Sequence, residues 1–376
     1  MEPMRDYPQC MDICICDITE LECLRAMFAP NAAGTLFRKE TQLSIPPGAR
    51  YASALAARVR TCGATSRRLH VAVPPDSRRV RHDDIACHKY IAPREGEQFV
   101  DFGSGVAGLS IEHFYASICP RLTFVQRLQL GFELCGWYTI IPNPEYENEA
   151  EQRTVPPTSD SHRLADSKAG IINNPVSDAQ INQHGENSAQ NSSPTAFKTV
   201  SIERAPLTTV SKLIAFAKSN PHIRGAGLAL KALRFVADNA RSPQEAKLAI
   251  AMTLPYRMGG YNRGPLLMDY LVEGVDGMRR CDCFLLEGKV DVEYGSTQHH
   301  GTAQTMQEDS RRANELAALG ISVVNITRKE LRDPHLFHIA MKHLARIQNR
   351  PLRIRIADFA DRRDKLWSQL FPPFSA

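Results

Sequence analysis

The stretch RRCDCFLLEGKVDVEYGSTQHHG, residues 279–301, decides which fold we expect for the second half of the chain. Two apolar runs flank Glu287-Gly288, a dipeptide that suits a tight hairpin turn. A turn at these two residues pairs position 286 with 289, 284 with 291, and 282 with 293. Asp282 and Glu293 are then direct cross-strand partners on one sheet face, with Cβ atoms roughly 4.5–5.5 Å apart.

Two carboxylates at this separation predict a divalent metal site. Like charges repel, so the pKa of one group rises unless a cation lies between them. Carboxylate oxygens suit Mg2+ or Mn2+, and such an ion activates water and stabilises charge on a phosphodiester. The alternative is an exposed strand face with two solvated acids, which the direct opposition of like charges disfavours. We therefore predict that Asp282 and Glu293 are catalytic metal ligands, with Asp291 on the same face opposite Phe284.

Residues after the second strand of the hairpin are candidates for proton transfer. The chain leaves the strand through Gly295-Ser296, so Gln298, His299 and His300 can return towards the carboxylates. A histidine there serves as a general acid or base near neutral pH, or as a metal ligand. The alternative interpretation is a polar loop without chemistry.

Glu245 has two interpretations of equal weight. It follows Ser242 by three residues, so the pair forms a capping box in which the glutamate bonds the amide at the start of the helix. Alternatively, Glu245 adds a third carboxylate to the metal site.

The hydrophobic periodicity around the hairpin predicts the element order α-β-β-β-α-β. A helix opens at Ser242-Pro243, with serine as N-cap and proline at the first helical position. Two earlier helices are expected at 211–218 and 228–238. Hairpin and crossover connections together imply an α/β sandwich with a mixed sheet. The remaining expected elements are strands at 266–272, 279–286 and 290–294, a helix at 304–319, a strand at 321–327 and a closing helix at 334–347.

The same residues carry a resemblance to a known family. Together with EDSRRANELAALG (308–320), ISVVNIT (321–327) and SPQEAKLAIAMTLPYRMGGY (242–261), the hairpin resembles the very-short-patch-repair-like endonucleases. These belong to the PD-(D/E)XK, restriction-endonuclease-like superfamily, and the match covers about residues 206–352. The resemblance implies a Mg2+-dependent DNA endonuclease with an αβββαβ core and a mixed sheet. It implies that Asp282 and Glu293 bind metal, that Glu245 is the acid of the first core helix, and that His299 and His300 are the histidine pair.

One position departs from the pattern of the family. Relatives commonly read E-Y-D after the third strand, whereas this chain has Gly295 at the third position, which is also the usual site of the superfamily lysine. Gln298 or a histidine is the candidate substitute.

The composition divides the chain into four parts. Residues 146–200 are rich in Asn, Ser, Pro and Gln and predict a disordered linker. It separates an N-terminal α+β domain, residues 1–145, from the endonuclease-like domain, residues 201–352, and a C-terminal tail, residues 353–376. DITELECLRAM (17–27), LHVAV (69–73) and RLQLGFELCGWY (127–138) give the N-terminal domain a weaker resemblance to regions that precede nuclease domains in AbiEi-type antitoxin proteins.

Basic residues suggest contacts with a polyanion. The net charge of +5 is compatible with a nucleic-acid partner but does not establish one. A basic hairpin near residue 80 either touches phosphates or is a solvated loop, and an arginine pair near residue 311 either meets DNA or forms an exposed ion pair with Asp309. The arginines in question are Arg78, Arg79, Arg81, Arg311 and Arg312.

The cysteines and the apolar runs bear on the compartment. Ten cysteines without a preceding secretory leader predict reduced thiols in the cytoplasm. Cys10, Cys14 and Cys16 lack the second cysteine pair of a zinc site. The sequence contains no run of 18 consecutive apolar residues, so we expect no membrane span.

Three functions follow from these observations. The leading hypothesis is a Mg2+- or Mn2+-dependent DNA endonuclease, whose N-terminal domain binds DNA or a protein partner. The second is a catalytically degenerate, antitoxin-like regulator that binds nucleic acid with the nuclease fold. The third is a partner-binding scaffold, which would show no salt-dependent affinity for DNA.

Overall fold

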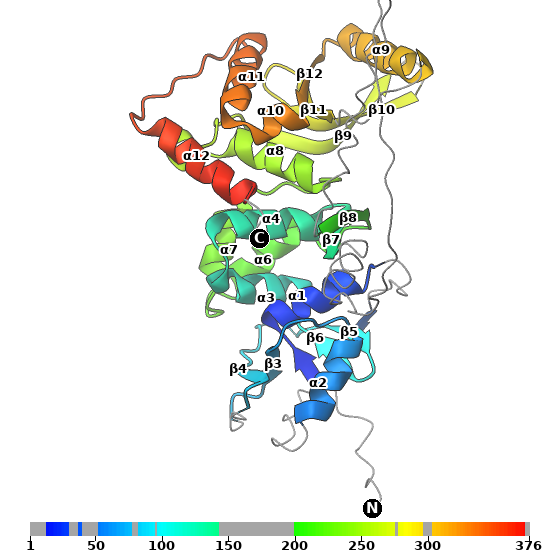
Figure 1. Cartoon of the computed structure of the whole chain (residues 1–376), viewed down its shortest axis with the longest axis vertical. Coiled ribbons are helices and arrows are strands. Elements are labelled where there is room, and N and C mark those ends of the chain that lie inside the picture. Colours follow the sequence, from blue (N-terminus) through cyan, green and yellow to red (C-terminus); the bar gives the residue numbers. More distant parts are fainter. Residues whose placement is uncertain are drawn as a thin grey trace, which may run out of the picture. The chain divides into compact units, whose positions relative to one another are not determined.

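The computed structural model is a mixed α/β structure, drawn in Figure 1. It describes residues 13–29, 37–39, 52–76, 82–94, 96–142, 199–274, 277–295 and 303–372. The expected linker, residues 146–200, lies almost wholly outside these ranges. The described residues before 142 and after 200 belong to one compact unit.

The N-terminal residues build a six-stranded sheet in the order β2-β5-β6-β1-β3-β4. The central strand β1 runs parallel to β6 and antiparallel to β3, which is in turn parallel to β4. Helix α1 (Asp17–Ala26) follows β1 in the chain, and helix α2 (Ala52–Thr61) precedes β3. The strands are β1 (Ile13–Ile15), β2 (Phe37–Lys39), β3 (Leu69–Val73), β4 (Ile85–Lys89), β5 (Phe99–Gly103) and β6 (Val106–Gly108).

Described helices before residue 142 and after residue 200 share one hydrophobic cluster. Within it, α6 and α7 contact α3, α7 contacts α4, and α4 also contacts α8. Strand β7 (Tyr138–Pro142) pairs with β8 (Thr199–Glu203), and the Arg204 guanidinium donates a 2.7 Å hydrogen bond to the Glu133 carbonyl. These contacts connect the two parts of the chain, and the domain boundary expected near residue 201 stays a prediction. These helices are α3 (Ile111–Ile118), α4 (Phe124–Cys135), α6 (Val210–Ser219), α7 (Ala226–Leu233) and α8 (Pro243–Thr253), with a 3-10 turn, η2, at Cys119–Arg121.

A second sheet has four strands in the order β12-β11-β10-β9. Strands β9 (Leu266–Gly274), β10 (Gly277–Leu285) and β11 (Val290–Gly295) form an antiparallel meander, and β12 (Ser322–Thr327) returns parallel to β11 after helix α9 (Ala303–Ala318). With α8 in front, the elements follow the predicted order α-β-β-β-α-β. One face packs in the large cluster with Cys283 and Val292, and the other packs with Leu316 of α9.

The hairpin register agrees with the prediction from the turn. Phe284 pairs with Asp291, and Leu285 pairs with Val290. Turn residues 286–289 close the hairpin, and Gly288 adopts a φ of 83° that favours glycine.

The C-terminal residues are helical. They form α10 (Arg328–Arg332), α11 (Pro334–Ile347) and α12 (Phe359–Leu370). Helix α12 contacts η3 (Tyr256–Met258), a 3-10 turn that lies between α8 and β9. Residues 353–376, expected as a tail, thus include a helix whose Trp367 indole is buried and donates a 3.0 Å hydrogen bond to the Leu331 carbonyl. None of the helices within the described ranges has the length and apolar character needed to cross a bilayer. No disulfide joins the nine cysteines of the described part.

Candidate functional site

The second sheet is irregular where Asp282 lies. The β9–β10 ladder pairs Cys281 with Tyr270 and Cys283 with Met268, but the position between them, Asp282 opposite Asp269, is not paired. Asp269 has a φ of 53°, a left-handed conformation that aspartate tolerates better than most residues.

This irregularity reverses the two faces of β10. Cys281 and Phe284 belong to one small cluster with Leu316, although residues three apart in a regular strand face opposite sides. Cys283 packs in the large cluster on the other face. Asp282 therefore sits at the switch between the two faces, where the ladder with β11 also ends.

The Asp282 carboxylate takes the place of a missing ladder bond. The Tyr294 backbone N–H donates a 3.2 Å hydrogen bond to Asp282 Oδ2. Burial raises the pKa of Asp282, and the neighbouring Glu293 raises it further, while the Tyr294 amide and Arg312 oppose the rise. The expected repulsion between Asp282 and Glu293 is thus part of the electrostatics of the site.

Glu245 bonds at the start of α8 and lies near Asp282, while its role in a metal site stays a prediction. Ser242 Oγ donates a 2.8 Å hydrogen bond to Glu245 Oε1, and the Arg241 amide donates a 2.9 Å bond to Oε2. The bonded amide is therefore that of the residue before the N-cap, not of Ser242 itself. Burial, followed by the charge of Asp282, raises the pKa of Glu245 to about 7. The helix-capping glutamate is also a neighbour of the candidate catalytic acid.

Arg312 is the cation at Glu293. Its Nη2 lies 2.5 Å from Glu293 Oε1, and the same guanidinium donates to the Arg280 carbonyl. The sequence suggested an ion pair between Arg312 and Asp309, whose side chain lies outside the described part. Among the described side chains, the acid that forms an ion pair with Arg312 is Glu293 of β11.

Asp291 lies deeper than the other acids. It is fully buried, and this burial, followed by the charge of Glu293, raises the pKa of its carboxyl. Burial and repulsion both favour the neutral form of Asp291. This acid therefore adds little negative charge to the site near neutral pH.

Further arginines surround the acids. Arg280 Nη1 lies 2.6 Å from one oxygen of Asp269 and 2.7 Å from the other, and Arg241 Nη1 lies 3.5 Å from Asp269. Arg311 is exposed and pairs with Glu315 at 3.3 Å. The acids are thus bordered by guanidinium groups, the side chain best suited to phosphate oxygens.

The structure brings together some of the predicted residues and leaves others outside its description. Asp282, Glu293 and Glu245 gather around the end of the β10–β11 ladder, with Arg312 beside them. The residues that fall outside the described ranges are Arg78, Arg79, Arg81, Gln298, His299 and His300.

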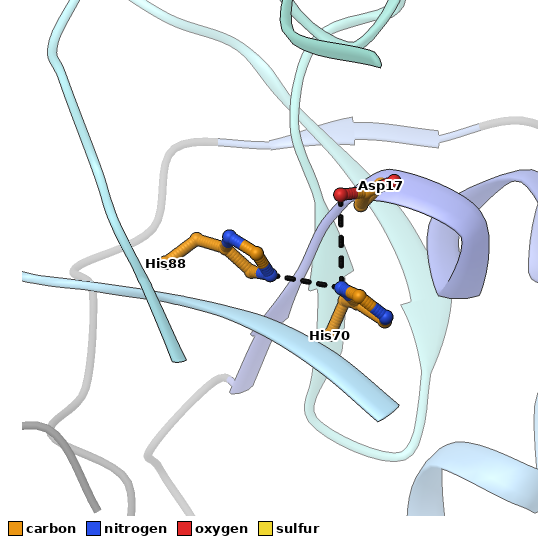
Figure 2. A group of neighbouring side chains, drawn as sticks. All are labelled: Asp17, His70 and His88. Carbon is orange, nitrogen blue, oxygen red and sulfur yellow. Dashed lines mark hydrogen bonds and ion pairs between the residues drawn. The ribbon is translucent and has the colours of Figure 1, made fainter. Parts of the chain in front are cut away.

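Sequence reasoning missed two features. Asp269 interrupts the apolar run LLMDYLVEG, and an acid at such a position is the signal that points to it. A second group, Asp17, His70 and His88, lies in the N-terminal sheet (Figure 2). Its ligand atoms all lie within 4.8 Å of one another, a condition that no three acids of the second sheet meet among the described residues.

Comparisons with known proteins add no relative. No protein family, no curated protein and no solved structure matches the chain.

Proposed function

We propose that the chain is a divalent-metal-dependent nuclease that hydrolyses phosphodiester bonds of DNA. The observation that carries the proposal is the position of Asp282. It lies where the ladder with β11 ends. Burial raises the pKa of both Glu245 and Asp282; the charge of Asp282 raises the pKa of Glu245 further, and the charge of Glu293 raises the pKa of Asp282 further. Buried acids that perturb one another are characteristic of functional sites. The order α-β-β-β-α-β with β12 parallel to β11 also agrees with the core that the resemblance implies.

The donor set suits a hard dication. Asp282 and Glu293 would hold Mg2+ or Mn2+ through carboxylate oxygens, with Glu245 in support. When bound, such an ion activates water and stabilises charge on the phosphodiester. Glu293 Oε1 is buried and lacks a partner in hydrogen-bonding geometry, although Arg312 is close. This oxygen is the one we expect to bind the ion.

The residues around the ion have separate roles in this proposal. Glu245, with a pKa of about 7, holds or releases a proton near neutral pH. Arg312, once replaced at Glu293 by the metal, is free to contact a phosphate of the substrate. His299 and His300 remain the proposed proton-transfer residues from the segment after β11.

The second candidate function is a regulator that binds nucleic acid without cleaving it. Two observations favour it. Gly295 provides neither the carboxylate nor the lysine of the family pattern. Arg312 and Arg280 already neutralise Glu293 and Asp269. In either case DNA is the partner, and the N-terminal domain would bind DNA or a protein partner.

Cleavage of supercoiled plasmid tests the proposal. The purified chain is incubated with Mg2+ or Mn2+ beside Asp282→Ala, with Asp361→Ala, an exposed acid on α12, as the matched control. We expect nicking by the wild type and the control and a loss of at least about 100-fold in Asp282→Ala. Equal nicking by all three proteins, or none by any, refutes the nuclease.

Salt dependence of DNA binding separates the remaining functions. A regulator binds DNA with an affinity that falls steeply with salt, whereas a scaffold shows no such dependence. Absence of nicking together with salt-dependent binding therefore selects the regulator.

A further inference from the structure

A second cluster of ligating side chains lies far along the chain from the proposed nuclease site. Asp17 begins α1 directly after β1, His70 lies on β3 and His88 on β4 (Figure 2). Strand β3 pairs with both β1 and β4, so the two histidine strands lie beside β1, and the start of α1 after β1 brings Asp17 to them.

The register explains why the two histidines meet. His70 pairs with Ala86, and Ala72 pairs with His88, so the histidines are diagonal neighbours on one sheet face. The His70 amide donates a 2.9 Å hydrogen bond to Thr19 Oγ1, which fixes the start of β3 against α1. Asp17 is thereby held beside His70.

The distances between the ligand atoms are close to those of a metal site. His70 Nδ1 lies 2.8 Å from His88 Nε2 and 3.6 Å from Asp17 Oδ2. A tetrahedral zinc ion with bonds of about 2.0–2.1 Å separates its ligand atoms by about 3.3 Å. The two imidazole rings are 12° from parallel with centroids 5.0 Å apart, and the 2.8 Å contact between their nitrogens is a hydrogen bond that a bound ion would replace.

The donor groups suit a metal. Two imidazole nitrogens and one carboxylate oxygen are ligand atoms that zinc takes in proteins, and imidazole binds in its neutral form. Cys16, directly before Asp17, is not among the residues whose ligand atoms lie within 4.8 Å of one another.

A cavity adjoins the cluster and leaves room for an exogenous ligand. Its volume is about 410 Å3, and Asp17 and His88 form part of its wall. Lys89, Arg121 and Arg224 line the same cavity and give it a positive character. An ion with three protein ligands keeps an open position on this side, as catalytic zinc sites do.

We propose that Asp17, His70 and His88 bind a divalent transition metal ion, best suited to Zn2+, with an open coordination position facing the basic cavity. Nitrogen donors from two histidines with one carboxylate favour Zn2+ over Mg2+. Arg121 forms an ion pair with Asp17 Oδ2, and its side chain is about half exposed. The ion takes over the neutralisation of Asp17, and Arg121 turns to the cavity, where a small anion completes the coordination.

Metal titration of the full-length, tag-free protein tests this site. After removal of bound metal with a chelator, Co2+ is added as a spectroscopic probe and then displaced by Zn2+. In an Asp282→Asn, His299→Ala, His300→Ala background, which removes the proposed nuclease ligands, we expect one equivalent of Co2+ with visible ligand-field absorption. The affinity should be at least about tenfold weaker when His70→Ala or His88→Ala is added. His343→Ala, an exposed histidine on α11, is the matched control and should leave the affinity unchanged.

X-ray absorption spectroscopy identifies the ligands of the ion without replacing any residue of the cluster. X-ray absorption at the zinc edge of the wild-type protein should show two imidazole nitrogens and oxygen ligands, also in an Asp282→Asn, His299→Ala, His300→Ala background. This background separates the cluster from the proposed nuclease site. A wild-type protein without Zn2+ or Co2+ affinity overturns the proposal. Wild-type affinity in a folded His70→Ala variant, or a zinc spectrum without imidazole ligands, also overturns it.

Discussion

Glu245 illustrates how one carboxyl group combines a structural and an electrostatic role. Its oxygens accept hydrogen bonds from Ser242 and from the Arg241 amide, yet burial and Asp282 raise its pKa from 4.5 to about 7. In the unfolded chain the same group titrates at its ordinary value. The folded protein therefore holds this proton more tightly than the unfolded protein.

The consequence is a loss of stability as the pH rises. Between about pH 4.5 and pH 7 the unfolded state has released the proton and the folded state keeps it, so the free energy of unfolding falls with pH. The full effect of this group is on the order of 3 kcal/mol. Glu245→Gln does not titrate, so its free energy of unfolding should fall less between pH 5 and pH 8 than that of the wild type. Urea denaturation at both pH values measures this, and identical pH dependence of the two proteins contradicts the assignment.

Gly295 offers a gain-of-function test at the same site. A Cβ built at this glycine meets no atom of the described residues within 4 Å, and its φ is not in the left-handed region. Gly295→Asp should therefore fold with a stability change within about 1 kcal/mol. It adds a carboxylate two residues from Glu293 on the same strand face, so the affinity for Mn2+ should rise roughly tenfold.

Calorimetric titration with Mn2+ measures the effect of Gly295→Asp. The control is Gly227→Asp on the exposed surface of α7, which also has no atom within 4 Å of the added Cβ. An unchanged Mn2+ affinity in Gly295→Asp would show that the end of β11 does not face the metal.

At the scale of elements, helix α9 provides Arg312, whose positive charge neutralises Glu293 of the second sheet. Arg312 reaches Glu293 and the Arg280 carbonyl, whereas Arg311 one residue earlier pairs with Glu315 of its own helix. Arg312→Ala removes the competitor of a metal at Glu293 and also removes a phosphate contact. We expect Mn2+ affinity to rise several-fold and DNA affinity to fall, with a salt slope reduced by about one.

Arg311→Ala is the matched control for that pair of measurements. Its guanidinium is exposed, so it should change DNA affinity modestly and Mn2+ affinity not at all. Opposite shifts of the two affinities in Arg312→Ala support the account, and a parallel loss of both contradicts it.

The elements of the second sheet were predictable because their causes are local. The turn at Glu287-Gly288 determines the register, which the Phe284–Asp291 pair confirms. Ser242-Pro243 marks the start of α8 by local capping. The irregularity opposite Asp269 was not predictable, because it lies where β10 changes the face that it presents to the two hydrophobic clusters, and those clusters are formed by residues distant in sequence.

The contacts of the candidate site were predictable only in part. The turn places Asp282 and Glu293 near one another, but the β10–β11 ladder ends at the Cys283–Val292 pair, so the two acids are not the direct cross-strand pair that was expected. The Arg312 partner does not follow from the sequence, because local spacing favours Asp309 over a residue on another strand. The cluster of His70 and His88 with Asp17 needs three strands separated by long stretches of chain. A single sequence does not give such a strand order.

At the scale of the whole molecule, described residues before 142 and after 200 share one hydrophobic cluster. Buried residues such as Leu128 of α4, Ala229 of α7 and Leu248 of α8 belong to it. A cluster of this kind predicts that the described residues before 142 and after 200 unfold in one cooperative transition. Thermal unfolding followed by circular dichroism and by tryptophan fluorescence should give coincident midpoints. Two separated transitions would support the independent domains expected from composition.

The most direct test of the metal-dependent nuclease is Mn2+ binding at its acids. Calorimetric titration is carried out in a His70→Ala background, which removes the N-terminal cluster, with and without Asp282→Asn. The account predicts one Mn2+ site in the background protein and a loss of at least about tenfold in affinity when Asp282 is replaced. The same affinity in both proteins, or no Mn2+ binding in either, would contradict it.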